Sequence, residues 1–280
     1  MKIGIISDIH LFNKTASIER ALSEIGDVDL LLIAGDIADR ADQRQYAIFL
    51  QLIKKHHVSV PVYCVSGNHD NPTRDDTNYR RFERSINDEY CSIVDECGAF
   101  YKHINEQIDI MGVNPSYYQK QFFFPEKGRQ LTFLEEKLVA SDCEYHIVMC
   151  HPPLIAHNPQ RAEDRSPYIV KEQDDRLQRI IDKSGRVVFV SGHTHVFPDV
   201  EFDDIHRNLY INDGSICPTT VKNGNNAEEQ GNITLLVIDD NAITVTAMGI
   251  EDGKILVERR KTSDPHQYEG REHPMRGKGK

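Results

Sequence analysis

Five stretches of the chain end in residues whose side chains can bind metal ions or move protons. They are, in order, Asp8-Ile9-His10, Gly35-Asp36, Gly67-Asn68-His69-Asp70, His151 and Gly192-His193-Thr194-His195. Carboxylate, amide and imidazole groups coordinate cations, and histidine also exchanges a proton near neutral pH. Taken singly, such stretches are common by chance, and a single histidine is more often hydrogen-bonded to a backbone carbonyl. Metal chemistry therefore requires that the fold bring the five together.

A short apolar run precedes each of these stretches and predicts a strand. The runs cover residues 3–7, 30–34, 62–65, 147–150 and 187–191. In open α/β sheets the ligand crevice lies beyond the carboxyl ends of the strands, so polar residues that directly follow a strand lie where a substrate is met. We therefore expect the five stretches to converge. Gly35, Gly67 and Gly192 are expected to allow sharp turns and close backbone approach there.

The apolar pattern between the strands predicts helices and further sheet. Apolar residues recur at helical intervals over residues 18–25 and 46–53. Strand, helix and strand alternate in this part of the chain, which predicts a parallel sheet. Residues 92–113 suggest a hairpin or meander. Later runs at 209–215, 233–238 and 242–247 predict strands, so the second half is expected to add antiparallel strands and a second sheet.

Composition narrows the class of protein. At 280 residues the chain can bury a core without disulfides, and five stretches that must converge favour one domain. The formal net charge of −11 argues against an extended nucleic-acid surface but allows a small phosphorylated substrate. The six cysteines form no CxxC pair, so thiolate ligands are not expected. The first apolar run is too short for a signal peptide or a membrane span. We therefore expect a cytoplasmic protein without membrane contact. The sequence does not predict the oligomeric state.

Four features have a structural and a functional interpretation. The four arginines between residues 74 and 84 are better explained as a solvated face than as anion contacts. The aromatic residues at 117–118 and 122–124 are expected to pack in the core or under a lid, with pocket lining as the alternative. Residues 156–175 are polar and irregular, a candidate loop over the site. Residues 262–280 lack an apolar pattern and are expected to form a disordered tail.

In this order, the five stretches together resemble the full signature of the calcineurin-like metallophosphoesterases, over about residues 1–220. The resemblance implies a four-layer α/β/β/α sandwich of two mixed sheets flanked by helices, with the domain at residues 1–261 and the tail at 262–280. It also implies two metal ions bridged by Asp36. The remaining implied ligands are Asp8, His10 and His195 for one ion, and Asn68, His151 and His193 for the other.

The chemistry implied by this resemblance is hydrolysis of a phosphate ester. Two cations about 3.5–4 Å apart lower the pKa of a shared water, so that hydroxide attacks phosphorus while the ions neutralise the phosphoryl oxygens. Mixed oxygen and nitrogen ligands without thiolate favour manganese, iron or zinc without choosing among them. His69 is not a ligand in the family pattern; it could protonate the leaving oxygen, with Asp70 orienting its ring. A turn cap is the other interpretation of Asp70.

The motif set is most similar to that of the bacterial class III cyclic-nucleotide phosphodiesterases. We therefore expect a metal-dependent phosphoric ester hydrolase that acts on phosphodiesters such as cyclic nucleotides. A phosphomonoesterase with the same site is the alternative, because loops decide the substrate on a shared fold. Asp39-Arg40 lies near the place of a protein-phosphatase motif, but Gly-Asp-Ile-Ala-Asp-Arg matches it poorly. A scaffold that lost the chemistry would be expected to lack ligands, and here all seven positions and His69 follow the pattern.

Overall fold

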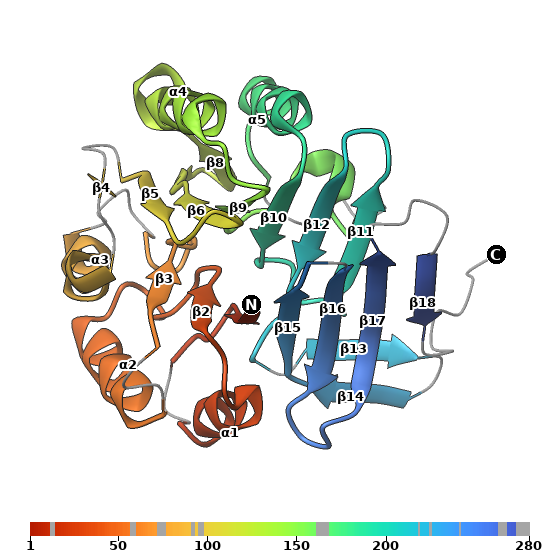
Figure 1. Cartoon of the computed structure of the whole chain (residues 1–280). Coiled ribbons are helices and arrows are strands. Elements are labelled where there is room, and N and C mark those ends of the chain that lie inside the picture. Colours follow the sequence, from red (N-terminus) through yellow and green to blue (C-terminus); the bar gives the residue numbers. More distant parts are fainter. Residues whose placement is uncertain are drawn as a thin grey trace.

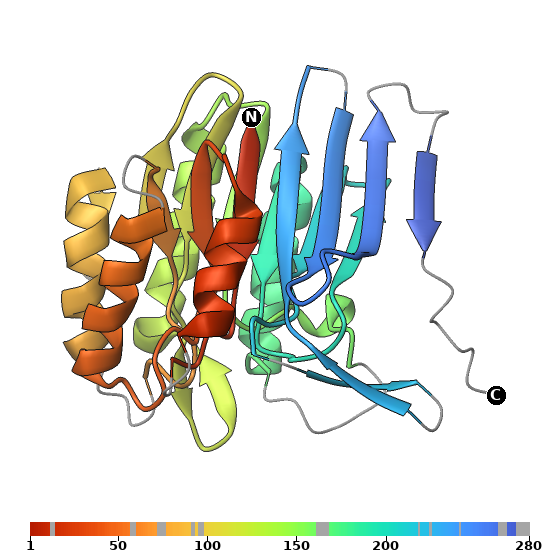
Figure 2. The same cartoon turned by 90° about the horizontal axis from the view of Figure 1, so that it is seen from below.

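The computed structural model describes residues 1–11, 15–56, 60–71, 77–90, 93–94, 98–160, 168–217, 219–223, 226–240, 242–262 and 268–272. Two seven-stranded sheets lie face to face, and helices cover both outer faces (Figures 1 and 2). Two short hairpins stand apart from these sheets. They are β7 (Ser116–Tyr118) with β8 (Gln121–Phe123), and β13 (Thr219–Asn223) with β14 (Asn226–Gln230).

The first sheet has the strand order β18-β17-β16-β15-β1-β2-β3. Its parallel part consists of β1 (Lys2–Ile6), β2 (Leu30–Ile33) and β3 (Val62–Cys64). These strands are nearly continuous apolar runs, as expected for strands covered on both faces. The antiparallel part consists of β15 (Asn232–Ile238), β16 (Ala242–Gly249), β17 (Ile255–Thr262) and β18 (Tyr268–Glu272).

The second sheet has the strand order β11-β12-β10-β9-β6-β5-β4. Its four central strands are parallel: β6 (Ile108–Gly112), β9 (Tyr145–Met149), β10 (Val187–Ser191) and β12 (Asn208–Asn212). The antiparallel edges are β4 (Ile93–Val94) and β5 (Phe100–His103) on one side and β11 (Asp199–Asp203) on the other. The β4–β5–β6 meander confirms the pattern predicted for residues 92–113.

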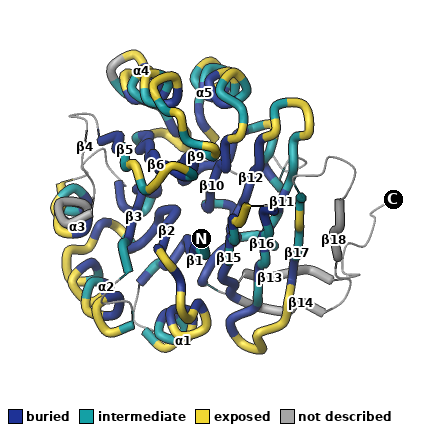
Figure 3. Tube along the Cα trace, in the orientation of Figure 1, coloured by how far each residue is buried: buried dark blue, intermediate teal, exposed yellow. Residues whose placement is uncertain are grey.

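Three apolar cores separate the layers, and buried residues run along the central strands (Figure 3). The outer helices are α1 (Ala16–Ile25), α2 (Gln43–His56) and α3 (Thr77–Tyr90) on the first sheet, and α4 (Pro125–Ala140) and α5 (Lys171–Ser184) on the second. Phe49 and Phe82 pack against the first sheet, Leu134 and Leu177 against the second, and Leu32 belongs to the core between the sheets. This arrangement confirms the predicted four-layer α/β/β/α sandwich.

The C-terminal strands join the first sheet, whereas the second sheet is built around β9 and β10. β15 pairs antiparallel with β1, with Gly4 opposite Leu235. A strand at the end of a parallel set leaves backbone N–H and C=O groups that must find partners, and β15 supplies them. The alternation of apolar residues in β15 and β16 predicts strands but does not reveal which sheet they join.

The segment predicted to be a disordered tail contains one described strand. β18 pairs antiparallel with β17, from Tyr268 opposite Lys261 to Glu272 opposite Val257. Backbone groups make this pairing, so it needs no apolar side-chain pattern and the composition of the segment did not indicate it. Residues 263–267 and 273–280 lie outside the described residues. The division into a domain at 1–261 and a tail stays a prediction.

The helices expose polar surfaces. On α3, Arg81 and Arg84 are exposed, and Arg80 lies 3.7 Å from the buried carboxylate of Glu83. Arg74 lies outside the described residues. Within the part of the chain that the structure describes, no helix is both long and apolar enough to cross a bilayer.

Candidate metal centre

The five predicted stretches meet at one end of the sandwich, beyond the carboxyl ends of the parallel strands. They come from both sheets, because β1, β2 and β3 belong to the first and β9 and β10 to the second. The backbone N–H of His193 donates to Asp8 Oδ2 at 2.8 Å, which joins the loop after β10 to the loop after β1. The N–H of His69 donates to Asp36 Oδ1 at 2.8 Å. The centre therefore depends on how the two sheets pack.

Five of the predicted residues have a left-handed backbone. The φ angles are 48° for Asp8, 40° for His10, 51° for Asp36, 71° for His193 and 48° for His195. Non-glycine residues in this conformation are uncommon and cluster at functional sites. Glycines serve the same loops by allowing close approach, because a side chain at Gly67 would collide with Asp36 and one at Gly192 with Asp8. Backbone geometry thus aims these side chains at a common point.

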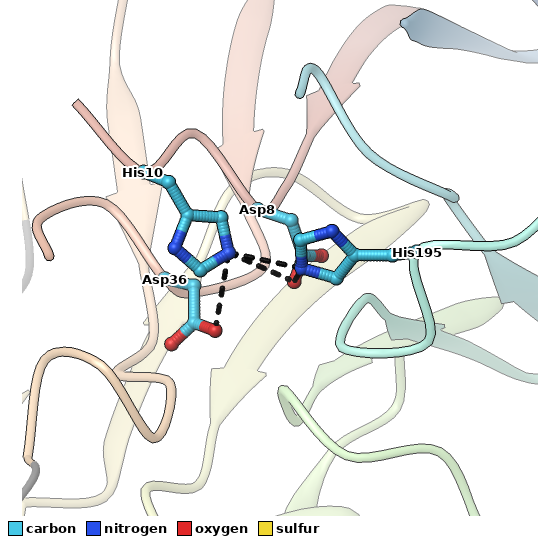
Figure 4. Close-up of side chains that lie close together, drawn as sticks. All are labelled: Asp8, His10, Asp36 and His195. Atoms are coloured by element: carbon cyan, nitrogen blue, oxygen red, sulfur yellow. Dashed lines mark hydrogen bonds and ion pairs between the residues drawn. The ribbon is translucent and has the colours of Figure 1, made fainter. Parts of the chain in front are cut away.

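Asp8, His10, Asp36 and His195 form the first group of converging side chains (Figure 4). One ligand atom from each lies within 4.8 Å of the others. His10 Nε2 is 2.9 Å from His195 Nε2 and 3.6 Å from Asp36 Oδ2. His195 Nε2 is 3.0 Å from Asp8 Oδ1. The structure therefore brings together the three residues implied for one ion and the implied bridging carboxylate.

Asp36, His151 and His193 form a second group within the same 4.8 Å limit. His151 Nε2 is 3.3 Å from Asp36 Oδ2 and 3.3 Å from Asn68 Oδ1. The other ring nitrogen, Nδ1, lies 2.7 Å from the carbonyl oxygen of Ala34. A hydrogen bond at Nδ1 fixes the tautomer and leaves the Nε2 lone pair for a cation, an arrangement common in metal sites. Asp36 belongs to both groups.

Unpartnered buried atoms show that these side chains fit a cation. His193 Nε2 is buried and has no hydrogen-bond partner. Asp8 Oδ1 is also without one, since its approach to His195 Nε2 lacks hydrogen-bond geometry. Buried polar atoms are rarely left unpaired, and such exceptions in a native fold mark an ion or a functional role. Carboxylates and imidazoles that converge on the same space supply the donor set of manganese, iron or zinc sites.

The charge states of Asp8, Asp36 and His193 also suit a cation. Burial would raise the pKa of Asp36, but the adjacent His151 ring lowers that pKa below its usual range. Burial would likewise raise the pKa of Asp8, but the adjacent His195 lowers it, and the pKa of Asp8 lies below its usual value. Burial and the neighbouring His151 lower the pKa of His193 to about 3, so its imidazole is neutral. Ionised carboxylates and a neutral imidazole are the forms that coordinate metals.

Asp39, a residue outside the predicted set, holds the ring of His69. His69 Nδ1 lies 2.7 Å from Asp39 Oδ1, and the backbone N–H of Asp39 donates to Gln45 Oε1 at 2.6 Å. The His69 ring meets that of His10 edge to face with 4.4 Å between centroids, and its side chain is 40% exposed. His69 thus stands at the mouth of the first group. His10, Asp39 and His69 also form a third set of atoms within 4.8 Å.

Asp70 lies behind the centre rather than against His69, which corrects the orienting role expected for it. Its buried carboxylate accepts hydrogen bonds from the backbone N–H of Ile37, Ala38 and Gly67 at 3.0–3.1 Å. Tyr46 Oη donates a fourth at 2.7 Å. The three backbone donors belong to the loops after β2 and β3, and Tyr46 belongs to α2, so Asp70 ties this helix to the loops that carry Asp36 and Asn68. The turn-cap interpretation matches these contacts.

Replacing Asp70 is expected to destabilise the fold. Asp70→Ala leaves three buried N–H groups without acceptors, so the free energy of unfolding should fall by about 3–5 kcal/mol. Tyr46→Phe removes one hydrogen bond to the same carboxylate and should cost about 1.5–3 kcal/mol. Urea unfolding of metal-free protein measures both. A stable but inactive Asp70→Ala variant would show instead that Asp70 acts in the chemistry.

The β7–β8 hairpin packs aromatic rings against the second group. Phe122 is fully buried, and its ring lies edge-on to His193 with 5.1 Å between centroids. Phe124 is buried as well, so the expected packing role is confirmed for both phenylalanines. Tyr117 lies opposite Phe122 in the hairpin, with 5.1 Å between ring centroids. Burial and then the charge of Asp36 raise the pKa of Tyr117.

The loop expected over the site is described in part. Gln160 Nε2 donates to the carbonyl oxygen of Thr194 at 2.7 Å, so residue 160 lies against the loop that carries the last two histidines. The final residues of the predicted loop belong to α5, which begins at Lys171. Residues 161–167 lie outside the described residues.

Comparisons with known proteins agree with this geometry. A family model described as calcineurin-like phosphoesterase matches residues 1–197. The chain is similar to a probable cyclic nucleotide phosphodiesterase of Fibrobacter succinogenes, with 24% identity over 228 residues, 75% of this chain and 78% of that protein. It is also similar to a probable glycerophosphodiester phosphodiesterase of Arcobacter nitrofigilis, with 24% identity over 60% of this chain and 56% of that protein.

Solved structures share the fold. A dimetal phosphatase from Danio rerio superimposes with a TM-score of 0.59 at 12% identity, over 91% of this chain and 98% of that one. Identity this low carries the architecture and nothing about substrate.

Proposed function

The chain belongs to the calcineurin-like phosphoesterase family, a family of hydrolases acting on phosphoric esters, and on this premise we propose that it cleaves phosphodiesters such as cyclic nucleotides with two metal ions. The diester preference is supported by two curated relatives whose names describe probable phosphodiesterases. The family and the packing of the candidate ligands support the use of metals.

The observation that carries the proposal is the position of Asp36. Its carboxylate lies 3.6 Å from His10 Nε2 in the first group and 3.3 Å from His151 Nε2 in the second. A carboxylate shared between two groups of donors is what a pair of cations requires. One ion would be held by Asp8, His10, Asp36 and His195, and the other by Asp36, Asn68, His151 and His193.

Bound cations at these positions would supply positive charge for the phosphoryl oxygens and acidify a water. The protein's own contribution to the proton balance is His69. Asp39 fixes the ring through Nδ1, so Nε2 is the nitrogen available at the open side of the centre. From there it can donate a proton to the leaving alcohol.

Metal removal and restoration tests the proposal. Protein stripped by a chelator is expected to lose turnover, and manganese should restore it with two ions bound per chain. Restored protein should cleave bis(p-nitrophenyl) phosphate with a higher kcat/KM than p-nitrophenyl phosphate. Preference for the monoester would replace the proposal with a phosphomonoesterase. Binding of metal without turnover of either ester would favour the scaffold interpretation.

Tyr117 is expected to contact the ester group of the substrate. In the β7–β8 hairpin its side chain shares the face of Phe122, which packs on the histidines, while Tyr118 lies on the other face. Tyr117→Ala should therefore raise KM for an aryl diester by about tenfold, because a ring that stacks on a substrate contributes about 1–3 kcal/mol. Steady-state kinetics of bis(p-nitrophenyl) phosphate measures the effect.

Tyr118→Ala is the matched control, since Tyr118 is 45% exposed and points away from the centre. It should leave KM unchanged. Equal effects of the two substitutions would show that the hairpin as a whole, and not the Tyr117 ring, affects binding.

A further inference from the structure

A cavity of about 580 Å³ lies at the end of the sandwich remote from the metal centre. Its walls come from the starts of β9, β10 and β12 in the second sheet and from β16 and β17 in the first. The candidate metal ligands follow the opposite ends of β9 and β10. A five-residue strand spans about 17 Å, so the two sites are separate. The volume falls within the usual range of small-molecule sites, about 300–1,000 Å³.

Tyr145, Arg186 and Arg207 stand in a row at the edge of this cavity. In the parallel register, His146 is opposite Val187 and Val188 is opposite Leu209, so these three residues are neighbours across the sheet. The backbone N–H of Arg186 donates to the carbonyl oxygen of His206 at 3.3 Å. Burial and Glu144 raise the pKa of Tyr145, whereas the positive charges of Arg207 and Arg186 lower it.

Arg186 and Arg207 are the unpaired cations of this lining, within the part of the chain that the structure describes. Within the described residues, no carboxylate lies within 4.0 Å of either guanidinium group. Lys261, the third cation of the lining, is paired with Asp204 at 2.7 Å. Arg186 and Arg207 directly precede β10 and β12, and like charges at neighbouring positions of this kind repel one another. An anionic group bound between Arg186 and Arg207 would relieve that repulsion, and guanidinium groups bind phosphate and carboxylate through paired hydrogen bonds.

The apolar and acidic residues of the lining indicate what the ligand carries besides its anionic group. Phe202, Leu209 and Ile243 present apolar surface from both sheets. Glu144, Asp204 and Asp240 are also in the lining and would repel a second anionic group. We propose that this cavity binds a small organic anion with one phosphate or carboxylate group on Arg186 and Arg207 and a flat apolar part against Phe202.

A fluorescent reporter can be placed in the cavity because the chain contains no tryptophan. Phe202→Trp puts the sole indole on the cavity wall, so metal-loaded protein can be titrated with phenylphosphonate, benzoate and inorganic phosphate. We expect a saturable change with phenylphosphonate or benzoate and weaker binding of inorganic phosphate. The stronger of the two aromatic probes identifies the anionic group. Ile205→Trp, at a residue that is 86% exposed beside the lining, is a second reporter if the first does not fold.

The arginines are tested in the reporter background. Arg186→Gln with Arg207→Gln should raise Kd for the bound probe at least tenfold, whereas Arg44→Gln with Arg179→Gln, which alters two exposed helix residues, should leave it unchanged. Circular dichroism melting checks that each variant is folded. No saturable change with either aromatic probe, or an unchanged Kd in the Arg186/Arg207 variant, overturns the proposal. The reporter lies away from the metal centre, so the result does not depend on the hydrolytic substrate.

Discussion

Asp36→Asn is expected to lower kcat for bis(p-nitrophenyl) phosphate by at least about 10³-fold, since a loss of about 4 kcal/mol in transition-state stabilisation corresponds to that factor. The substitution keeps the shape of the side chain and removes the negative charge that both groups of candidate ligands share. Two cations brought close together repel one another, and a neutral amide does not offset that repulsion. Metal content per chain, measured by mass spectrometry, should fall from two ions to one or none.

Asp175→Asn provides the control for this experiment. Asp175 lies on α5 and pairs with Lys171 at 2.9 Å, away from the centre. The same change of charge there should leave both turnover and metal content unchanged. If Asp36→Asn retained two tightly bound ions and near-normal kcat, the bridging role proposed for Asp36 would be wrong.

His69→Ala is expected to lower kcat by about 10²–10⁴-fold, the usual contribution of a general acid or base, without loss of metal. Asp39→Asn should cause a smaller loss, because it leaves the ring present but removes the carboxylate 2.7 Å from Nδ1. In the variant that combines His69→Ala with Asp39→Asn, the loss of kcat should not exceed that of His69→Ala alone. The Asp39 carboxylate acts only through the His69 ring. Steady-state kinetics of the two single variants and the double variant measure these losses.

Diesters with different leaving groups distinguish a proton-transfer role of His69 from a merely structural one. A p-nitrophenolate leaves without much help, so His69→Ala should impair diesters with alkyl leaving groups more strongly than bis(p-nitrophenyl) phosphate. A structural defect would lower all rates by a similar factor. Loss of a metal ion from the His69→Ala variant would make His69 a ligand, for which His10 and Asp39 offer neighbouring donor atoms.

The order and types of the candidate ligands could be predicted, because each of them directly follows a strand pattern that is visible in the local sequence. The strands before Asp8, Asp36 and His151 are nearly continuous apolar runs, and each ends where the polar residues begin. Such patterns arise from interactions within a few residues of the chain. For the same reason the meander at 92–113 could be predicted, whereas β18, which depends on the edge of β17, could not.

The partner of His69 is where local reasoning failed. Asp70 is adjacent in sequence, but its side chain turns inward to three donors on two loops and to Tyr46 on α2. Asp39 from the loop after β2 takes the place beside the ring. Asp39 carries a signal in the sequence, because it stands three residues after Asp36 beside Arg40, near the place of a known motif. Adjacency in sequence is a poor guide in such loops, because the side-chain direction follows the backbone angles.

The sequence by itself determined the family, the candidate ligands and the strands that end at them. Only the tertiary structure decided that the two sheets share the centre and that Asp39 rather than Asp70 holds His69. These contacts join residues 30 to 185 positions apart, such as His10 and His195. Contacts of that kind are made when apolar layers pack and bring separate loops into register, and no local pattern of residues specifies the result.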